Sequence, residues 1–168
     1  MKGVLFLCVA NSARSQMAEG IARSLMPLGV PVWSAGSNPT HVRPEAIAVM
    51  NEIGIDISAH TSKALSDVPM DAIDTIITLC AEEVCPRVPE SVRHLHWSLP
   101  DPAGVDGSPE DRMAAFRKTR DELRRRIEVF LADDRAIRRS LPGSVPVVDR
   151  LRNDDILGGW INEAGVVT

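Results

Sequence analysis

A short, uninterrupted apolar run near the N-terminus places the first constraint on the fold. Residues 3–9 read GVLFLCV and are bounded by polar residues, as in a parallel strand covered on both faces. Shorter runs of this kind follow at PVWSAGS, AIDTIITLC and RHLHWSL, and helical spacing occupies residues 15–26 and 44–53. The order β-α-β-α-β-β-α predicts an α/β fold, a four-stranded parallel sheet flanked by helices.

Local signals at helix ends support this division. Pro44 suits the first turn of a helix and Gly54 suits its end. A last long helix is expected to begin at SPED, where Ser108 can cap the N-terminus, Pro109 fits the first position and Asp111 can complete a reciprocal cap. The arginines of this helix are interspersed with acidic residues, which indicates a solvated face rather than a nucleic-acid site.

Composition limits the partners and the compartment. The 168 residues carry a formal net charge of −4, so neither nucleic acid nor an anionic membrane is an expected partner. The apolar stretch Gly3–Leu7 is too short for a secretion leader. Three cysteines suit a reducing compartment and reactive thiols better than a disulfide framework, which predicts a cytoplasmic protein.

The chain is predicted to divide unequally. Residues 1–134 contain all the expected strands and helices and would form the catalytic domain. Residues 135–168 mix turn residues with short apolar pieces and are assigned to a C-terminal extension of unknown role.

The loop CVANSAR between the first strand and the first helix has the most informative spacing. Five residues separate Cys8 from Arg14, so the backbone can curl around a tetrahedral oxyanion that loop N–H groups, the helix N-terminus and the guanidinium all reach. The same field stabilises a thiolate and makes Cys8 a nucleophile. Asn11 suits a positive-φ position, and Ser15 can hydrogen-bond the sulfur. The predicted anion-binding residues are Asn11, Ser12, Ala13, Arg14 and Ser15.

The motifs CVANSARSQMAEG, SAG at Ser34–Gly36 and DPAG at Asp101–Gly104 resemble those of the low-molecular-weight protein tyrosine phosphatase family. They resemble more closely its thioredoxin-coupled arsenate reductases, whose loop is likewise followed by SQMAEG. The resemblance covers residues 2–131. It implies that family's fold, with the anion loop after the first strand, and an arsenate or phosphate oxyanion as substrate without a bound cofactor.

Two activities are compatible with this resemblance. A phosphatase needs only Cys8, the anion loop and a general acid, and the family places an Asp-Pro such as Asp101 over the anion to supply the proton. The chain has no tyrosine, and Ala103 and Gly104 follow Pro102, so nothing in that loop would hold a phenol ring. Hydrolysis of phosphomonoesters through a cysteinyl-phosphate is therefore the alternative function.

The segment TLCAEEVCP carries two thiols that a phosphatase does not need. Cys80 ends the third apolar run, at the same end of a parallel sheet as Cys8, and Cys85 follows on a loop. In the reductases that this chain resembles, the second cysteine attacks the thiol-arsenate adduct, arsenite leaves, and a third cysteine resolves the disulfide. Arsenate reduction is therefore the predicted function. Thioredoxin with thioredoxin reductase, glutaredoxin or a small thiol could each serve as reductant.

Some reductases of this branch bind potassium at positions that match Asn11, Glu19, Ser34 and an acidic residue, where this chain has Lys63. An ammonium near Glu19 would replace the ion, so no potassium requirement is expected.

A zinc-stapled binding module is the remote alternative. Its ligands would be Cys80, Cys85, His94 and His96, but H-x-H on a strand departs from the usual spacing of zinc ligands, so no metal site is predicted. The two other histidines, His41 and His60, are predicted to be loop or capping residues rather than catalytic bases.

Overall fold

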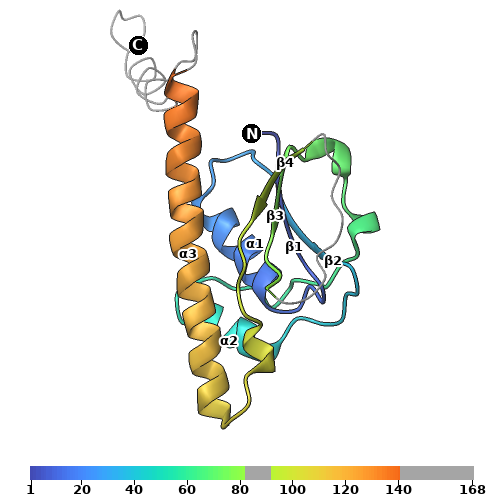
Figure 1. Cartoon of the computed structure of the whole chain (residues 1–168), viewed down its shortest axis with the longest axis vertical. Coiled ribbons are helices and arrows are strands. Elements are labelled where there is room, and N and C mark those ends of the chain that lie inside the picture. The colour runs from blue at the N-terminus through green and yellow to red at the C-terminus, as the bar shows by residue number, and fades with distance from the viewer. Residues whose placement is uncertain (82–91, 141–168) are drawn as a thin grey trace, which may run out of the picture. The chain divides into compact units, whose positions relative to one another are not determined.

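The computed structural model of the chain describes residues 1–81 and 92–140. Its elements, in chain order, are β1 (Val4–Cys8), α1 (Arg14–Leu25), β2 (Val32–Gly36), α2 (Pro44–Asn51), η1 (Leu65–Asp67), η2 (Met70–Ala72), β3 (Thr75–Thr78), β4 (Arg93–His96), η3 (Pro102–Gly104) and α3 (Pro109–Ser140), where η marks a 3₁₀ turn (Figure 1). The predicted order of strands and α-helices is confirmed. Each predicted start of a helix lies within one residue of the observed one.

The four strands form one parallel sheet in the order β2-β1-β3-β4, as predicted. Cys8 pairs with Gly36 of β2, and Leu7 pairs with Thr78 of β3. The carboxyl ends of the three strands β2, β1 and β3 therefore lie side by side at one edge of the sheet. In parallel α/β sheets this edge is where ligands bind.

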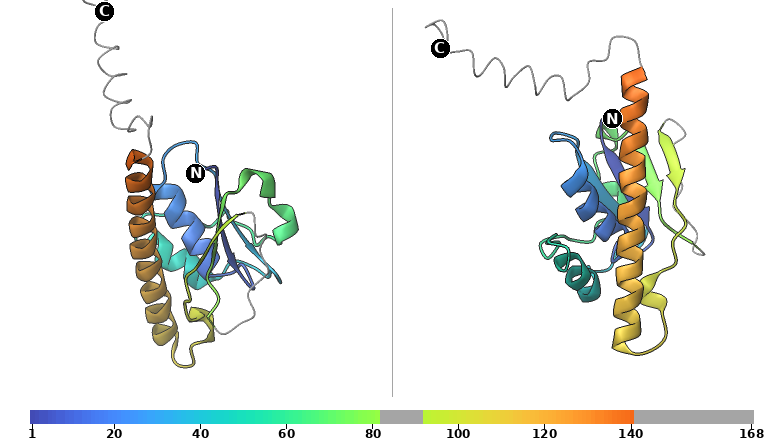
Figure 2. Two further views of the ribbon diagram at one scale, coloured as in Figure 1. Left: turned by 45° about the horizontal axis from the view of Figure 1, so that its top comes forward. Right: turned by 90° about the vertical axis from the view of Figure 1, so that its left-hand side faces the viewer.

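Both faces of the sheet are covered, which explains why the first strand is apolar throughout. All five residues of β1 are buried. Figures 1 and 2 show α1 on one face of the sheet and the segment with η1 and η2 on the other. On the second face, Leu5 and Leu7 join a core cluster with Ile76 of β3 and with Val68 and Ile73 from the turn segment.

The start of α3 confirms the predicted reciprocal cap. Ser108 Oγ accepts from the Asp111 backbone N–H at 3.1 Å, and Asp111 Oδ2 accepts from the Ser108 N–H at 2.9 Å. The described residues divide into two units after Glu128. Helix α3 continues over residues 135–140, which the sequence assigned to the extension, and the proposed boundary at 134 stays a prediction. Among the described residues, no helix is both long and apolar enough to span a membrane.

Candidate active site

The anion loop lies between the end of β1 and the start of α1. Cys8 is the last residue of β1 and Arg14 is the first residue of α1. Ala13 occupies the N-cap position, and its methyl group cannot bond to the free N–H groups of the first helical turn. Those groups are therefore available to an anion, as expected where a helix N-terminus binds phosphate.

A second segment holds the outer side of this loop. Backbone N–H groups of residues 37–43 donate to four loop carbonyls: Ser37 to Cys8, Asn38 to Val9, Thr40 to Ala10 and Arg43 to Ser12, at 2.9–3.4 Å. In a trans peptide the N–H points away from the carbonyl. The N–H groups that follow these carbonyls are therefore turned to the inner side of the loop, where an oxyanion would lie.

Gly36 permits this close approach. A Cβ atom at this position would lie 2.4 Å from the Val9 carbonyl oxygen and 2.9 Å from the Asn11 nitrogen. Both distances are too short for any side chain. The SAG motif thus acts by bringing the end of β2 against the anion loop.

The side chain of Asn11 connects the loop to residues of three neighbouring segments by hydrogen bonds. Its φ angle is 46°, the left-handed conformation that its sequence position predicts and that asparagine tolerates better than most residues. Its side-chain Oδ1 accepts from the Lys63 backbone N–H at 2.7 Å, and its Nδ2 donates to Ser15 Oγ and to Ser34 Oγ, each at 2.9 Å. Because the donors and acceptors of this side chain are paired, the strained loop conformation is well determined.

The thiol of Cys8 lies inside this loop and is 2% exposed. Its Sγ accepts from the Asn11 backbone N–H at 3.2 Å and lies 2.9 Å from Ser15 Oγ, which confirms the predicted serine contact. Two hydrogen-bonding groups are therefore directed at the sulfur.

The Arg14 side chain connects the loop to two other segments. Its Nη1 donates to the Leu99 carbonyl at 2.9 Å and to the Leu79 carbonyl at 3.4 Å, and its Nη2 lies 3.8 Å from Asp101 Oδ2. The guanidinium is nearly buried. A planar cation held this way keeps a fixed orientation toward the anion pocket.

Asp101 lines the same pocket as Cys8. Its Oδ1 accepts from the Ala103 N–H at 3.2 Å at the start of η3, and its side chain is 44% exposed. A cavity of about 230 Å³ is lined by Cys8, Val9, Ala10, Ser12, Ala13, Arg14 and Asp101. The structure therefore brings Cys8, Asp101 and three of the five predicted anion-binding residues, Ser12, Ala13 and Arg14, to one pocket, whereas Asn11 and Ser15 do not line it.

Cys80 lies at the same edge of the sheet as Cys8. Strand β3 ends at Thr78, and the Leu79 N–H donates to the Leu7 carbonyl at 2.8 Å, so the chain enters Cys80 alongside the end of β1. Cys80 is buried, as Cys8 is. The predicted placement of these two thiols is confirmed. Cys85 lies outside the described residues.

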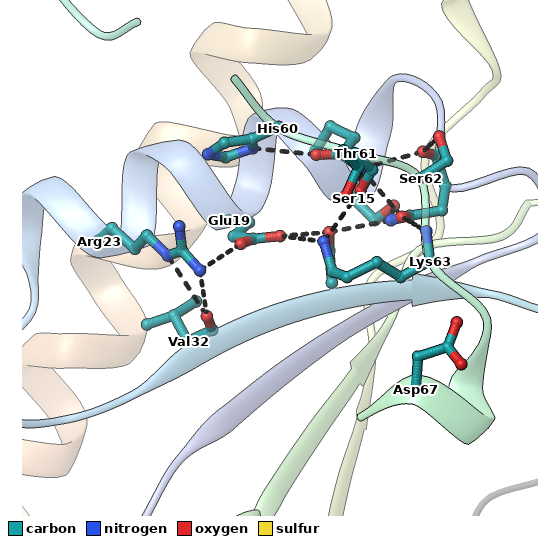
Figure 3. Close-up of polar contacts among 12 residues, drawn as sticks. Ser15, Glu19, Arg23, Val32, His60, Thr61, Ser62, Lys63 and Asp67 are labelled. Carbon is teal, nitrogen blue, oxygen red and sulfur yellow. Dashed lines mark hydrogen bonds and ion pairs between the residues drawn. The ribbon is translucent and has the colours of Figure 1, made fainter. Parts of the chain in front are cut away.

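A buried carboxylate is connected to the loop through Ser34, which bonds to Asn11. Figure 3 shows the polar contacts of this carboxylate. Glu19, on α1, is 1% exposed and accepts a short hydrogen bond from Ser34 Oγ. Arg23 Nη2 lies 2.6 Å and Lys63 Nζ 3.5 Å from its two oxygens. The expected ammonium beside Glu19 is thus present, and it also donates to the Thr61 carbonyl at 3.0 Å.

The two strand histidines share a hydroxyl partner. His94 Nε2 and His96 Nδ1 lie 3.0 Å and 2.8 Å from Thr78 Oγ1. Among the described residues, no group of three or more His, Cys, Asp or Glu side chains is arranged to hold a metal ion. The four-ligand zinc alternative includes Cys85 and so reaches beyond these residues.

The sequence did not predict the polar residues outside the loop that form hydrogen bonds with Asn11. Gln16 Nε2 donates to Asn11 Oδ1 at 2.9 Å, and Ser62 Oγ donates to the Asn11 carbonyl at 2.6 Å. Gln16 belongs to the SQMAEG motif, so only that motif offered a signal. Nothing local to residues 60–63 indicated a contact with a loop about 50 positions earlier.

Comparisons with known proteins agree with this geometry. Residues 3–141 match the family described as low molecular weight phosphotyrosine protein phosphatase. An arsenate reductase of Halalkalibacterium halodurans is 42% identical over 131 residues, which cover 77% of this chain and 94% of that relative.

Solved structures give the same picture. An arsenate reductase in its phosphate-binding state superposes with a TM-score of 0.68 at 37% identity, covering 79% of this chain and 98% of that one. A thioredoxin-dependent arsenate reductase of Corynebacterium glutamicum superposes with a TM-score of 0.54 at 30% identity, covering 76% of this chain and 62% of that one.

Proposed function

The chain belongs to the low molecular weight phosphotyrosine protein phosphatase family, and from that premise we propose that it is an arsenate reductase. One contact carries the proposal most directly. The carbonyl of Leu79, the residue before Cys80, accepts from Arg14 of the anion loop. The backbone that leads into Cys80 is therefore attached to the anion loop, which supports a role for a second thiol that phosphate hydrolysis does not require.

The first step uses the pocket as a phosphatase would. Arsenate binds to the loop N–H groups and to Arg14, and the Cys8 thiolate attacks arsenic to form an S–As bond. An oxygen leaves as water, with Asp101 supplying the proton. The arsenic is still As(V) at this point.

The second step transfers the electrons. Cys80 attacks Cys8 Sγ, a disulfide forms, and the electron pair of the S–As bond stays on arsenic, which leaves as arsenite, As(III). Cys85 then attacks Cys80 and releases the Cys8 thiolate, so the oxidised enzyme carries a Cys80–Cys85 bridge. An external dithiol such as thioredoxin, which thioredoxin reductase regenerates, reduces that bridge. Because every turnover needs free thiols and this reductant, we place the enzyme in the cytoplasm.

Hydrolysis of phosphomonoesters stays the second candidate, because Cys8, Arg14 and Asp101 suffice for it. The described lining of the pocket contains no aromatic side chain, which favours a small free oxyanion over an aryl phosphate.

An assay with arsenate, thioredoxin, thioredoxin reductase and NADPH tests the proposal by following NADPH consumption. Cys8→Ser is expected to abolish both this activity and hydrolysis of an aryl phosphate. Cys85→Ala is expected to stop arsenate turnover and to spare hydrolysis. Sustained arsenate turnover by Cys85→Ala with thioredoxin would contradict the relay.

A further inference from the structure

Two exposed histidine side chains converge on one atom at the edge of the sheet. His94 and His96 belong to β4, the edge strand of the sheet that the described residues form (Figure 1), and both are exposed. His94 Nε2 lies 3.0 Å and His96 Nδ1 lies 2.8 Å from Thr78 Oγ1. Two ring nitrogens are therefore directed at the same point on the surface.

The geometry of a strand explains this convergence. Side chains two residues apart on a strand point to the same face of the sheet, so His94 and His96 share a face, whereas Leu95 between them points to the other. The register places His96 opposite Thr78 of β3. The H-x-H spacing departs from the usual spacing of zinc ligands, but on a strand it brings two imidazoles together.

The Thr78 hydroxyl does not need both rings. The residue is fully buried, and its hydroxyl has one hydrogen to donate. The Leu95 carbonyl, 3.4 Å from Oγ1, is a further acceptor for that hydrogen. One imidazole is enough to keep this hydroxyl paired, so the second ring nitrogen serves no hydrogen bond that the fold requires.

Two neutral imidazoles on one face are ligands for a particular class of ion. Imidazole nitrogen suits zinc, copper and nickel, whereas calcium and magnesium take oxygen ligands. Metal–nitrogen bonds of about 2.0–2.1 Å are shorter than the hydrogen bonds that the rings make here, and exposed rings can rotate toward a shared ion. No described Cys, Asp or Glu joins the pair in a larger group of ligands.

We propose that His94 and His96 form a chelating site for a divalent late transition metal, with water in the remaining coordination positions. The site is separate from the oxyanion pocket, because neither histidine lines that pocket. The inference therefore does not rest on the reduction of arsenate. With two protein ligands, binding is expected to be weaker and more readily reversible than at a four-ligand structural zinc site.

The test is a calorimetric titration of the reduced, full-length protein with NiCl₂ at pH 7.5. Ni²⁺ is the probe because Cu²⁺ would oxidise the thiols. His94→Gln and His96→Gln each remove one proposed ligand, and both lie at exposed positions that tolerate a polar side chain. His41→Gln, at an exposed histidine of a loop, is the matched control. The three cysteines are present in every protein compared, so their contribution is common to all.

We expect each of the two β4 substitutions to weaken Ni²⁺ binding about tenfold or more, because the remaining ring loses the advantage of chelation. His41→Gln should stay within about twofold of the wild type. Unchanged affinity in both β4 variants would overturn the inference. Loss of affinity in only one of them would also overturn it, since a single ligand is not a chelate.

A second measurement depends on no variant's folding. Bound Ni²⁺ is paramagnetic and broadens the NMR signals of nearby nuclei. In the wild type, the imidazole signals of His94 and His96 should broaden together at substoichiometric Ni²⁺, before those of the other two histidines. Parallel broadening of all four rings would contradict a specific site on β4.

Discussion

The guanidinium of Arg14 donates a hydrogen bond to the backbone carbonyl of Leu99, with 2.9 Å between Nη1 and the oxygen. Arg14 begins α1, and Leu99 lies 85 residues further along the chain, two residues before Asp101. The cation that is proposed to bind the oxyanion therefore also positions the loop of the general acid. Replacing the planar guanidinium of Arg14 should therefore impair both anion binding and the placement of the Asp101 loop.

Arg14→Lys keeps the positive charge but removes the planar fork of donors. One ammonium cannot reach the Leu79 and Leu99 carbonyls and still present two hydrogen bonds to an anion. We expect kcat/KM for arsenate to fall about 10²–10³-fold, measured by NADPH consumption. Arg23→Lys serves as the control, because Arg23 is half-exposed and is not among the residues that line the pocket. A loss below about threefold would show that charge alone suffices.

Asp101→Asn tests the general acid separately from anion binding. The substitution replaces the ionisable carboxyl group, whose Oδ2 lies 3.8 Å from Arg14 Nη2, by an amide that can neither supply a proton nor carry a negative charge. We expect kcat for aryl phosphate hydrolysis to fall about 10²-fold or more, while phosphate, measured by calorimetry, binds equally well or more tightly. Asp106→Asn, in the same exposed loop, should change neither quantity. Unchanged kcat in Asp101→Asn would remove Asp101 from the mechanism.

The parts of this site that the sequence predicts are the local ones. The Cys8–Arg14 spacing, the positive φ of Asn11 and the reciprocal cap of Ser108 and Asp111 each depend on residues within six positions of one another. Strands are predictable for a related reason, because burial on both faces makes them apolar throughout.

Contacts between distant segments could not be predicted. The partners of Arg14 at Leu79 and Leu99 are backbone carbonyls, and any residue type could supply them. From the sequence, His60 was predicted to be a loop or capping residue. Its bond to Gln16 could not be predicted, because it forms only once β2 and the segment after α2 have folded into place. The helical path of residues 135–140 was missed since turn residues immediately follow it.

Lys63 is predicted to make the enzyme independent of potassium. Its ammonium lies 3.5 Å from Glu19 and bonds to the Thr61 carbonyl, so it already supplies a cation at this place. Replacing sodium by potassium at fixed ionic strength should leave kcat/KM for arsenate unchanged within about twofold. An increase of several-fold with potassium would contradict the role of Lys63.

The same lysine should also contribute to stability. Lys63→Met leaves the buried Glu19 with Arg23 as its remaining charged partner, and we expect a loss of about 1–2 kcal/mol in the free energy of unfolding. Urea denaturation at pH 7 measures it. Lys118→Met, on α3, is the matched control.

The ion pairs of Glu52 are expected to make a pH-dependent contribution to stability. It accepts hydrogen bonds from Arg117 and Arg120 of α3 at 2.8–3.0 Å, and the Arg117 bond is the largest cause that lowers the pKa of Glu52 below 4.5. A carboxylate with a lowered folded-state pKa stabilises the fold above pH 4.5, and this contribution is lost as the pH falls through the folded-state pKa.

Glu52→Gln should therefore lower Tm by about 1–3 °C at pH 7, since exposed ion pairs contribute little. The wild type and the variant should converge as the pH falls below 4.5 and through the folded-state pKa of Glu52, as followed by circular dichroism. Glu110→Gln removes the exposed and more distant partner of Arg117 and should have no effect. A difference of the same size at pH 3 would mean that the charge of Glu52 is not its cause.

The state of the three thiols after exposure to arsenate tests the proposed relay most directly. The reduced protein is treated with arsenate in the absence of any other reductant, alkylated, digested with trypsin and mapped by mass spectrometry without reduction. Residues 3–14 carry Cys8, and residues 64–87 carry both Cys80 and Cys85. The account predicts an alkylated, free Cys8, together with a peptide 64–87 that is two hydrogen masses lighter and carries no alkyl group. Three free thiols after this treatment, with robust hydrolysis of an aryl phosphate by the same preparation, would contradict arsenate reduction and identify the chain as a phosphatase.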